Sequence, residues 1–493
     1  MKEEIFRTQG EKRFGRIEGA TPPLGDPLDR ALRRHFGRRL ERAGSCRGVL
    51  AVAVLTGLLA VAGARAQEGP IRLSLREAVL RALEESGDLR VPAARSAVVE
   101  VKAQQDAARS RLLPRVSAAV GLQRQTRSLE AFGLRDFGLF QPPRLVGPFT
   151  VFDSRLQLTQ PLFDAAAWRQ YQAADRRTEA ARESERSVRD TVAAEAAVLY
   201  LDALQARASL EAAQADVALA EELLRLAEDQ KAAGTGTAID VTRARVRLSA
   251  ARQAELAART AVRDADARLK QRLGLPAGTM LELTEVVDAQ APPRHPAGEL
   301  AAAALERRAD VAAQRARVAA ARRAYEAARS ARWPSVVAAA DYGSVGSRFA
   351  EGIPTWSAAV TLRLPFFEGG ELEARKAEAK ERWRQEELRL QQLEREVRLQ
   401  VELASSALEL AQGRHALALE TLRQAEEELE QARRRYRAGV TTNLEVTDAQ
   451  AAVAAARSDV VESLHDVRAA RIRLSLAAGT VLEDLGIRGA TNP

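Results

Sequence analysis

Apolar and polar side chains alternate along four short segments of the chain. A period of two is typical of β-strands that have one apolar face. The apolar positions are Val116, Ala118, Val120 and Leu122; Phe152, Leu156 and Leu158; Val336, Ala338, Ala340 and Tyr342; and Trp356, Ala358, Val360, Leu362 and Leu364. The pattern therefore predicts two strand hairpins, at about 115–163 and about 335–365.

Around these strands the apolar positions follow a helical spacing. Two Ala-rich stretches, about 165–232 and about 370–437, carry seam residues every three or four positions, which is typical of a left-handed coiled coil. The seam residues are Ala203, Ala206, Leu210, Ala213, Val217, Ala220, Leu224 and Ala227, then Leu408, Ala411, His415, Ala418, Leu422, Ala425, Leu429 and Ala432. Shorter helices are expected at 74–110 and 238–273, and in the second half from about 296 to 332. The two short helices of the first half together match the length of its long helix, so we expect them to lie end to end along it.

The chain presents this plan twice. The segment 231–242 recurs as 437–447, with Gly439 following Gly234 by 205 residues. Each half reads as helix, strand hairpin, long helix, glycine turn and helix. A unit this long exceeds the common solenoid repeats and indicates two similar halves. We therefore expect a first repeat at 67–274, a Pro-containing linker at 275–296, a second repeat at 297–480 and a tail at 481–493.

The N-terminal residues 1–66 resemble an export signal. An apolar run at 48–62 follows Arg-rich sequence and precedes Ala64-Arg65-Ala66, which predicts a secretory signal that is cleaved after Ala66. The run is short for a spanning helix, and an uncleaved N-terminal anchor is the alternative. Residues 1–66 hold 13 Lys and Arg against 7 Asp and Glu, so cleavage removes most of the net charge of +8. It also removes Cys46, the only cysteine. The charge therefore gives no indication of nucleic-acid binding, and neither a disulfide nor a thiol metal site is expected.

Strands of this length and alternation suit a tilted crossing of an outer membrane. Four strands alone would leave open edges in lipid, so closure requires further copies of the chain. Three copies would give twelve strands, whereas the eight of a dimer would be too narrow to conduct. A soluble β-sandwich is the alternative. The predicted fold is mainly α with a small β part: duplicated coiled-coil hairpins form an α-barrel tunnel, and four strands per chain contribute to a 12-stranded trimeric outer-membrane β-barrel.

In their order and spacing, these segments resemble the TolC-like outer membrane efflux proteins. The resemblance runs from about Ser74 to Thr480 in both halves. It rests on Ser74-Leu-Arg-Glu-Ala, Leu112-Leu-Pro114, Thr159-Gln-Pro-Leu-Phe-Asp164, Gly234-Thr-Gly-Thr-Ala-Ile-Asp-Val241, Leu273-Gly274 and Gly439-Val-Thr-Thr-Asn-Leu-Glu-Val446. The resemblance implies a homotrimer in outer-membrane lipid, with a periplasmic tunnel that docks onto a periplasmic adaptor protein and, through it, an inner-membrane pump. The implied function is export of small molecules such as drugs. Type I protein secretion, metal-cation efflux and a non-conducting periplasmic scaffold are the alternatives.

The resemblance assigns adaptor-docking tips to the two glycine turns. These tips comprise Gly234, Thr235, Gly236 and Thr237, and Gly439, Val440, Thr441, Thr442 and Asn443. Because glycine permits a positive φ at a helix end, helix capping without docking is the alternative reading.

The resemblance also implies a periplasmic gate made of Asp240, Tyr436, Glu445 and Asp448. Glu445 and Asp448 are three residues apart on one helical face and match the acidic positions of the family's aperture. In a trimer they would form two rings of three carboxylates, which select cations. Asp240 and Tyr436 match positions that hold the aperture closed by hydrogen bonds.

This chain departs from the family pattern at the gate. Thr441 replaces an arginine that pairs across the junction, and Ile239 replaces a hydroxyl residue, so the latch is expected to be weaker or built differently. The first repeat has Asp240 and Arg243 where the second has Glu445 and Asp448, so only the second repeat carries two acids. A solvated helix face is the alternative reading of this pair.

Little in the sequence supports an enzyme. After residue 66 there are three histidines, His295, His415 and His465, and they are far apart in sequence. Gly234-Thr-Gly follows a helix, whereas a phosphate-binding loop would follow a strand. We therefore predict no catalytic residue, no metal site and no cofactor, and no nucleic-acid partner.

Overall fold

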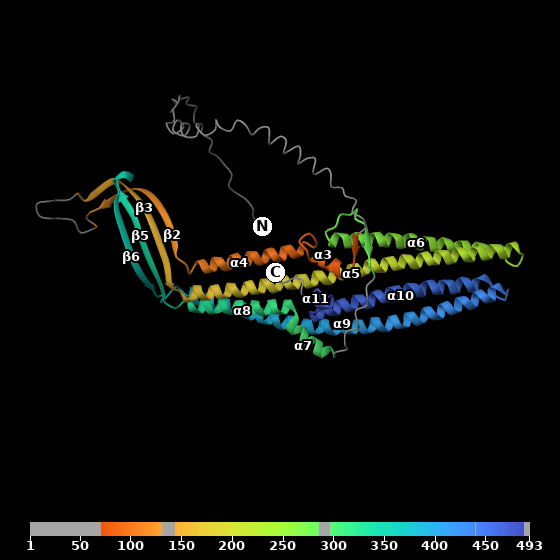
Figure 1. Cartoon of the computed structure of the whole chain (residues 1–493). Coiled ribbons are helices and arrows are strands. Elements are labelled where there is room, and N and C mark those ends of the chain that lie inside the picture. Colours follow the sequence, from red (N-terminus) through yellow and green to blue (C-terminus); the bar gives the residue numbers. More distant parts are fainter. Residues whose placement is uncertain (1–70, 130, 132–142, 285–295, 439, 488–493) are drawn as a thin grey trace, which may run out of the picture. The chain divides into compact units, whose positions relative to one another are not determined.

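The computed structural model describes residues 71–129, 131, 143–284, 296–438 and 440–487. The expected signal region 1–66, His295 and Gly439 lie outside these residues, as does half of the expected linker, 285–295. The described residues belong to a single structural unit. Long helices and one four-stranded sheet make up most of it (Figure 1).

The sheet consists of β2 (Arg115–Ser128), β3 (Leu145–Phe163), β5 (Ser335–Gly346) and β6 (Ile353–Arg363). The strands are antiparallel in the order β2-β3-β5-β6, so each half of the chain supplies one hairpin. In this register Val116 lies opposite Leu158, Leu156 opposite Tyr342, and Tyr342 opposite Trp356. The register confirms the prediction that the apolar residues of the four strands share one face.

The two faces of the sheet differ in chemistry. The apolar face is exposed, with 75% of Trp356 and 70% of Val120 accessible. On the other face Arg155 forms ion pairs with Asp153 on its own strand and Asp341 on the next. The sheet therefore carries a continuous apolar surface that has no cover within the described part of the chain, backed by a polar surface.

The two long helices are α5 (Ala165–Ala232) and α9 (Glu371–Arg437). The Asp164 side chain caps α5 by accepting the Ala167 amide at 2.9 Å, as its position after the strand predicts. The predicted seam residues Ala203, Ala220 and Ala227 of α5, and Leu408, Ala425 and Leu429 of α9, are buried. The seven-residue repeat therefore correctly identified the faces along which these helices pack.

Each long helix is accompanied by two shorter ones (Figure 1). Helices α4 (Arg90–Ser110) and α6 (Ala238–Arg272) pack on α5, while α8 (Ala309–Ser330) and α10 (Asn443–Ala478) pack on α9. The contacts confirm that short helices line one long helix in succession. They also give the lateral order α4–α5–α8–α9 beside the sheet and α6–α5–α10–α9 toward the glycine turns.

The first helix of each half is interrupted, which corrects the prediction of continuous helices over 74–110 and about 296–332. The first half has α3 (Leu75–Leu83) before α4, and the second has α7 (Ala297–Arg307) before α8. A capping box formed by Ser74 and Glu77 begins α3. Both breaks coincide with polar contacts to distant helices: Asp88 binds Arg272 of α6, and Arg308 binds Gln400 of α9.

A small parallel sheet was not predicted. It joins β1 (Ile71–Leu73) to β4 (Leu281–Leu283), near the two ends of the first repeat. The hydroxyl of Tyr200 on α5 lies 2.8 Å from the Leu73 carbonyl oxygen and 2.6 Å from that of Thr284. Tyr200 is fully buried, in the largest hydrophobic cluster of the described residues.

Two short helical segments complete the described structure. They are the 3-10 turn η2 (Phe349–Glu351) between β5 and β6, and α11 (Val481–Asp484). None of the helices in the described part of the chain is both long and apolar enough to cross a membrane.

Candidate functional site

The first glycine turn connects α5 to α6. Gly234 has a φ of 73°, and the amides of Thr235 and Gly236 both donate to the Gln230 carbonyl at 3.0 Å. Thr237 then begins α6 with a capping box: its amide and hydroxyl both donate to the Asp240 carboxylate, and the hydroxyl accepts the Asp240 amide. The turn is thus fixed by local hydrogen bonds that Gly, Thr and Asp supply.

The second turn connects α9 to α10 and is capped differently. The Val440 amide donates to the Arg435 carbonyl at 3.0 Å, and Thr442 precedes α10 without a side-chain cap. Glu445 is the counterpart of Asp240, 205 residues further on. Its longer side chain pairs with Arg435 of α9 at 3.1 Å, so it does not form a capping box.

The two acids of the second repeat lie away from the buried face of α10. Val446 and Ala449 point into the α9–α10 core, whereas Glu445 and Asp448 remain partly or fully accessible. The structure therefore leaves both carboxylates of this repeat at the surface next to the turn, while Asp240 of the first repeat serves as a cap.

Tyr436 occupies the last turn of α9 and is 7% exposed. It belongs to a hydrophobic cluster with Leu429, Ala432, Val446 and Ala449. Burial raises the pKa of its hydroxyl, and the negative charge of Asp240 raises it further. The hydroxyl has no hydrogen-bond partner among the described residues. The role of Tyr436 and Asp240 as a hydrogen-bonded latch stays a prediction.

A hydrogen bond links the helix starts that follow the two turns. The side-chain amide of Asn443, which is 3% exposed, donates to the Asp240 backbone carbonyl at 3.1 Å. This contact joins the first turn of α10 to the first turn of α6. The resemblance assigns Asn443 to the docking tip, and nothing in the sequence predicts its hydrogen bond to the other hairpin.

Charged side chains follow the seam between the two hairpins. His465 Nε2 lies 2.7 Å from the Asp202 carboxylate. Arg457 pairs with Asp216 at 3.7 Å, and Arg433 pairs with Glu222 at the same distance. The acids all belong to α5 and the bases to α9 and α10. Burial raises the pKa of Asp216, although Arg457 and Arg247 oppose this shift. The hairpins are therefore held together partly by ion pairs from Arg457 and Arg433 to acids of α5, and by the contact between His465 and Asp202.

Histidines contribute to packing in the described part of the chain. His415 Nδ1 lies 3.0 Å from the Ser463 hydroxyl, and His465 faces Asp202. Within the same residues no group of three or more His, Cys, Asp or Glu side chains is placed to hold a metal ion.

Known sequences of one family resemble this chain along most of its length. The sequence profile of the family described as "Outer membrane efflux protein" matches residues 79–275 and 300–480. The outer membrane efflux protein BepC of Brucella suis biovar 1 (strain 1330) is 28% identical over 342 residues, which is 68% of this chain and 74% of BepC. The toluene efflux pump outer membrane protein TtgF of Pseudomonas putida is 27% identical over 60% of each chain.

Solved structures share the same fold. The outer-membrane channel OprN superposes with a TM-score of 0.71 at 21% identity, over 82% of this chain and 90% of OprN. The outer membrane protein VceC of Vibrio cholerae gives a TM-score of 0.69 at 18% identity, over 82% of this chain and 96% of VceC. At these identities the likeness concerns the fold alone.

Proposed function

The chain belongs to the outer membrane efflux protein family and is an efflux channel of the outer membrane that extends into the periplasm, not an enzyme. From this premise we propose that three copies form one channel-tunnel. It would export small molecules from the periplasm or an inner-membrane pump, and dock onto a periplasmic adaptor through its helical tips. The names of the relatives, which include a toluene efflux pump protein, favour small molecules as the exported class.

The exposed apolar face of the sheet is the observation that carries this proposal. The four strands present Val120, Leu156, Tyr342 and Trp356 outward, and each of these side chains is at least half exposed. Exposed apolar surfaces of this extent mark contacts with lipid or with another protein. Lipid covers such a face in outer-membrane barrels, and the polar opposite face suits a water-filled lumen.

The edges of each layer support assembly with further copies. The sheet leaves β2 and β6 unpaired on their outer sides in the described part of the chain, and the helical layers leave α4 or α6 on one side and α9 on the other. In the sheet and in both helical layers, one outer element belongs to the first half of the chain and the other outer element to the second half. Such unlike edges join head to tail and close into a ring when the rotation permits. Three copies of the four-stranded sheet would supply twelve strands, an even number within the known range.

The surface of α9 supports the same arrangement. Leu403, Leu410 and Leu417 recur at seven-residue spacing and are each more than half exposed. A leucine stripe of this kind forms the seam of a coiled coil. In a closed ring, the α6 and α4 edge of the next copy would cover it.

The gate proposal predicts a change in ion selectivity. Glu445→Gln together with Asp448→Asn removes both carboxylates from the accessible face of α10, and rings of like charge select counter-ions. In planar bilayers under a KCl gradient, the preference of the channel for potassium over chloride should fall about threefold or more.

Glu255→Gln is the matched control for this experiment, because the Glu255 carboxylate pairs with Arg259 on α6 at 2.6 Å, away from both turns. It should leave the potassium preference unchanged. An unchanged preference in the double variant would remove Glu445 and Asp448 from the gate, whereas a protein that carries no current would contradict the channel function itself.

The docking proposal predicts site-specific crosslinks. Cysteines placed at Thr237 and Thr442 lie at the two helix starts next to the turns, and the only native cysteine is Cys46. A thiol-reactive crosslinker in intact cells should join both positions to an adaptor protein. Cysteine at Thr260, exposed on α6 and about 35 Å along the helix from Thr237 at 1.5 Å per residue, should give no such product. Equal crosslinking at Thr260 would contradict docking through the tips.

A further inference from the structure

A groove of about 590 Å³ runs across the helices beside the sheet. Residues of α4, α5, α8 and α9 line it together. Ten of the lining residues are alanines, among them the buried Ala173, Ala174 and Ala327. Short side chains leave the groove wide and its floor apolar. Its volume falls within the range of small-molecule sites.

The rim of the groove is cationic. Four arginines line it, Arg111, Arg177, Arg375 and Arg382, against a single acid, Glu378. Arg375 and Arg382 form ion pairs on their own helix with Glu371 and Glu378. The other two arginines therefore determine its net charge.

Arg111 and Arg177 have no acidic partner among the described residues. Arg111 donates to the neutral side-chain carbonyl of Gln170 at 3.0 Å. Arg177 is exposed and has neither an ion pair nor a hydrogen bond within the described part of the chain. A guanidinium presents several donors in one plane, which suits carboxylate and sulfonate groups. Two such groups over an apolar floor match a ligand with an anionic head and an apolar body.

The groove spans the full width of the helical layer. In the lateral order α4–α5–α8–α9, the outermost helices α4 and α9 both contribute to it. A single groove can reach all four helices only on the side toward which the layer curves. In the ring that we propose, this side faces the lumen, so the inference rests on the proposed channel function.

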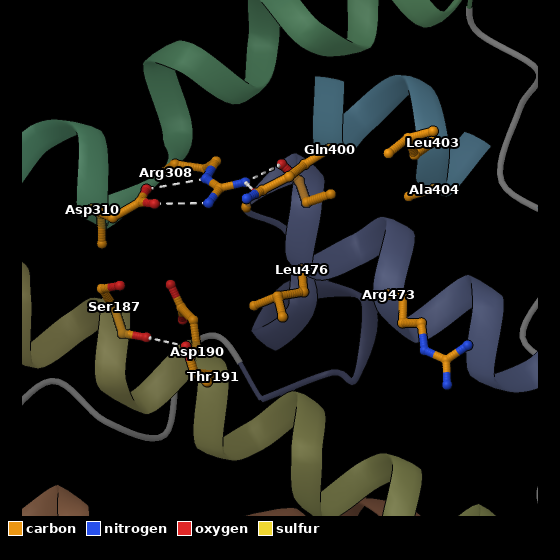
Figure 2. Close-up of a pocket in the computed structure, with 13 residues that line it drawn as sticks. Ser187, Asp190, Thr191, Arg308, Asp310, Gln400, Leu403, Ala404, Arg473 and Leu476 are labelled. Carbon is orange, nitrogen blue, oxygen red and sulfur yellow. Dashed lines mark hydrogen bonds and ion pairs between the residues drawn. The ribbon is translucent and has the colours of Figure 1, made fainter. Parts of the chain in front are cut away.

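A second cavity, of about 350 Å³, is lined by residues of α5, α8, α9 and α10 (Figure 2). It includes Thr191 of α5, 14 residues or about four helical turns after Arg177, and Gln400 of α9, 18 residues or about five turns after Arg382. Whole turns return to the same helical face, so both cavities open on one side of α5 and α9.

Two more arginines line this second cavity. Arg308 is held by Asp310 at 2.7 Å and Gln400 at 2.8 Å. Figure 2 shows Arg473 on α10 without a contact to the other residues drawn, and no ion pair of Arg473 occurs among the described residues. Unpaired guanidinium groups therefore recur along the wall from the sheet to the middle of the tunnel.

We propose that this arginine-lined groove binds anionic amphiphiles during export. The carboxylate or sulfonate group would contact Arg177 and Arg111, and the hydrocarbon body would lie on the alanine floor. The wall would thus favour anions beside the sheet, whereas the carboxylates of α10 act at the opposite end of the tunnel.

Block of the channel current tests this inference with two probes of similar shape. Naphthalenesulfonate carries the anionic group, and naphthol lacks it. Naphthalenesulfonate added on the barrel side should reduce the KCl current of the wild-type channel, while naphthol should not. Arg177→Gln should raise the half-blocking concentration of naphthalenesulfonate about tenfold, because one charge-assisted contact is lost. Arg111→Gln should act in the same direction.

Arg176→Gln is the matched control. Arg176 neighbours Arg177 but pairs with Glu179 at 2.6 Å and does not line the groove. Its replacement should leave the block unchanged. A conducting channel whose block is the same in wild type and Arg177→Gln, or equally weakened by Arg176→Gln, would overturn the groove. A wild-type protein without current would overturn the channel function and the groove with it.

Discussion

Replacing Gly274 by alanine is expected to lower the free energy of unfolding by at least about 3 kcal/mol. Gly274 follows α6 with a φ of 64°, a region that disfavours side chains. A Cβ atom at this position would also overlap the carbonyl oxygen of Ser86 in the α3–α4 connection. Because that obstacle is backbone, the whole connection would have to move.

Two other glycines separate the effects of conformation and contact. Gly234 has a φ of 73° with nothing within 4 Å of a built Cβ, so Gly234→Ala should cost only about 1 kcal/mol. Gly479, 205 residues after Gly274, has a φ of 74°, and its Cβ would lie 3.1 Å from the Arg308 side chain and 3.2 Å from the Arg308 backbone nitrogen. These contacts are tight but much less severe than the overlap at Gly274, so the cost should be intermediate. Thermal unfolding followed by circular dichroism would measure all three. Equal losses of unfolding free energy in the three variants would show that the contact with Ser86 does not add to the cost at Gly274.

The elements with a strong local period could be predicted from the sequence. The alternation of Val116, Leu156 and Trp356 gave the correct common face, since a strand repeats every two residues whatever its partners. The heptads of α5 and α9 gave the packing faces in the same way. Both patterns depend on near neighbours in the chain, which a sequence displays directly.

The interruptions of the first helices depend on distant contacts. Residues 74–110 have an acceptable helical spacing, so a continuous helix was the natural expectation. The break is stabilised where Asp88 binds Arg272, 184 residues away in sequence, and where Gly274 approaches Ser86. The run Ser86-Gly87-Asp88 is itself a turn signal and was the available clue. The pairing of β1 with β4 had no comparable signal, because three residues show no period.

The turns at the candidate site could be predicted from the sequence, but the side-chain contacts that they make with other elements could not. Glycine and threonine at 234 and 237 indicate a capped turn. The Arg435–Glu445 pair and the hydrogen bond from Asn443 to the Asp240 carbonyl depend on how α9 packs on α10 and one hairpin on the other. Sequence spacing identified Glu445 and Asp448 as surface acids, and only the fold distinguishes them from the capping Asp240.

Replacing Asp88 by asparagine is expected to cost about 3 kcal/mol of unfolding free energy. The side chain is 7% exposed and accepts from Arg90 at 2.8 Å and Arg272 at 2.5 Å. Both arginines also contact Glu195 of α5. The loss of the carboxylate charge leaves two guanidinium groups competing for Glu195. Glu85→Gln is the control: the Glu85 side chain is 79% exposed and pairs with Arg95. This replacement should lower the free energy of unfolding by less than about 1 kcal/mol.

Acid should erase the difference between the wild type and Asp88→Asn. The Arg90 and Arg272 guanidinium groups hold the pKa of the Asp88 carboxyl well below its usual range. A lowered folded-state pKa stabilises the fold above the ordinary aspartate pKa of about 4, and this contribution is lost as the pH falls further. The denaturation midpoints of the two proteins should therefore begin to approach each other below about pH 4, and should meet only where the Asp88 carboxyl is protonated in the folded protein as well.

A gap that persists undiminished in acid would mean that Asp88 acts by shape and not by charge. The second half supports a role for charge: it places Arg308 at the corresponding break and pairs it with Asp310 two residues later, the reverse of Asp88 and Arg90. Both halves thus keep an ion pair where the helix breaks, although the two residues have exchanged signs. Either of the two positions can therefore carry the positive charge. What the two halves share is an ion pair that stabilises the break in the helix.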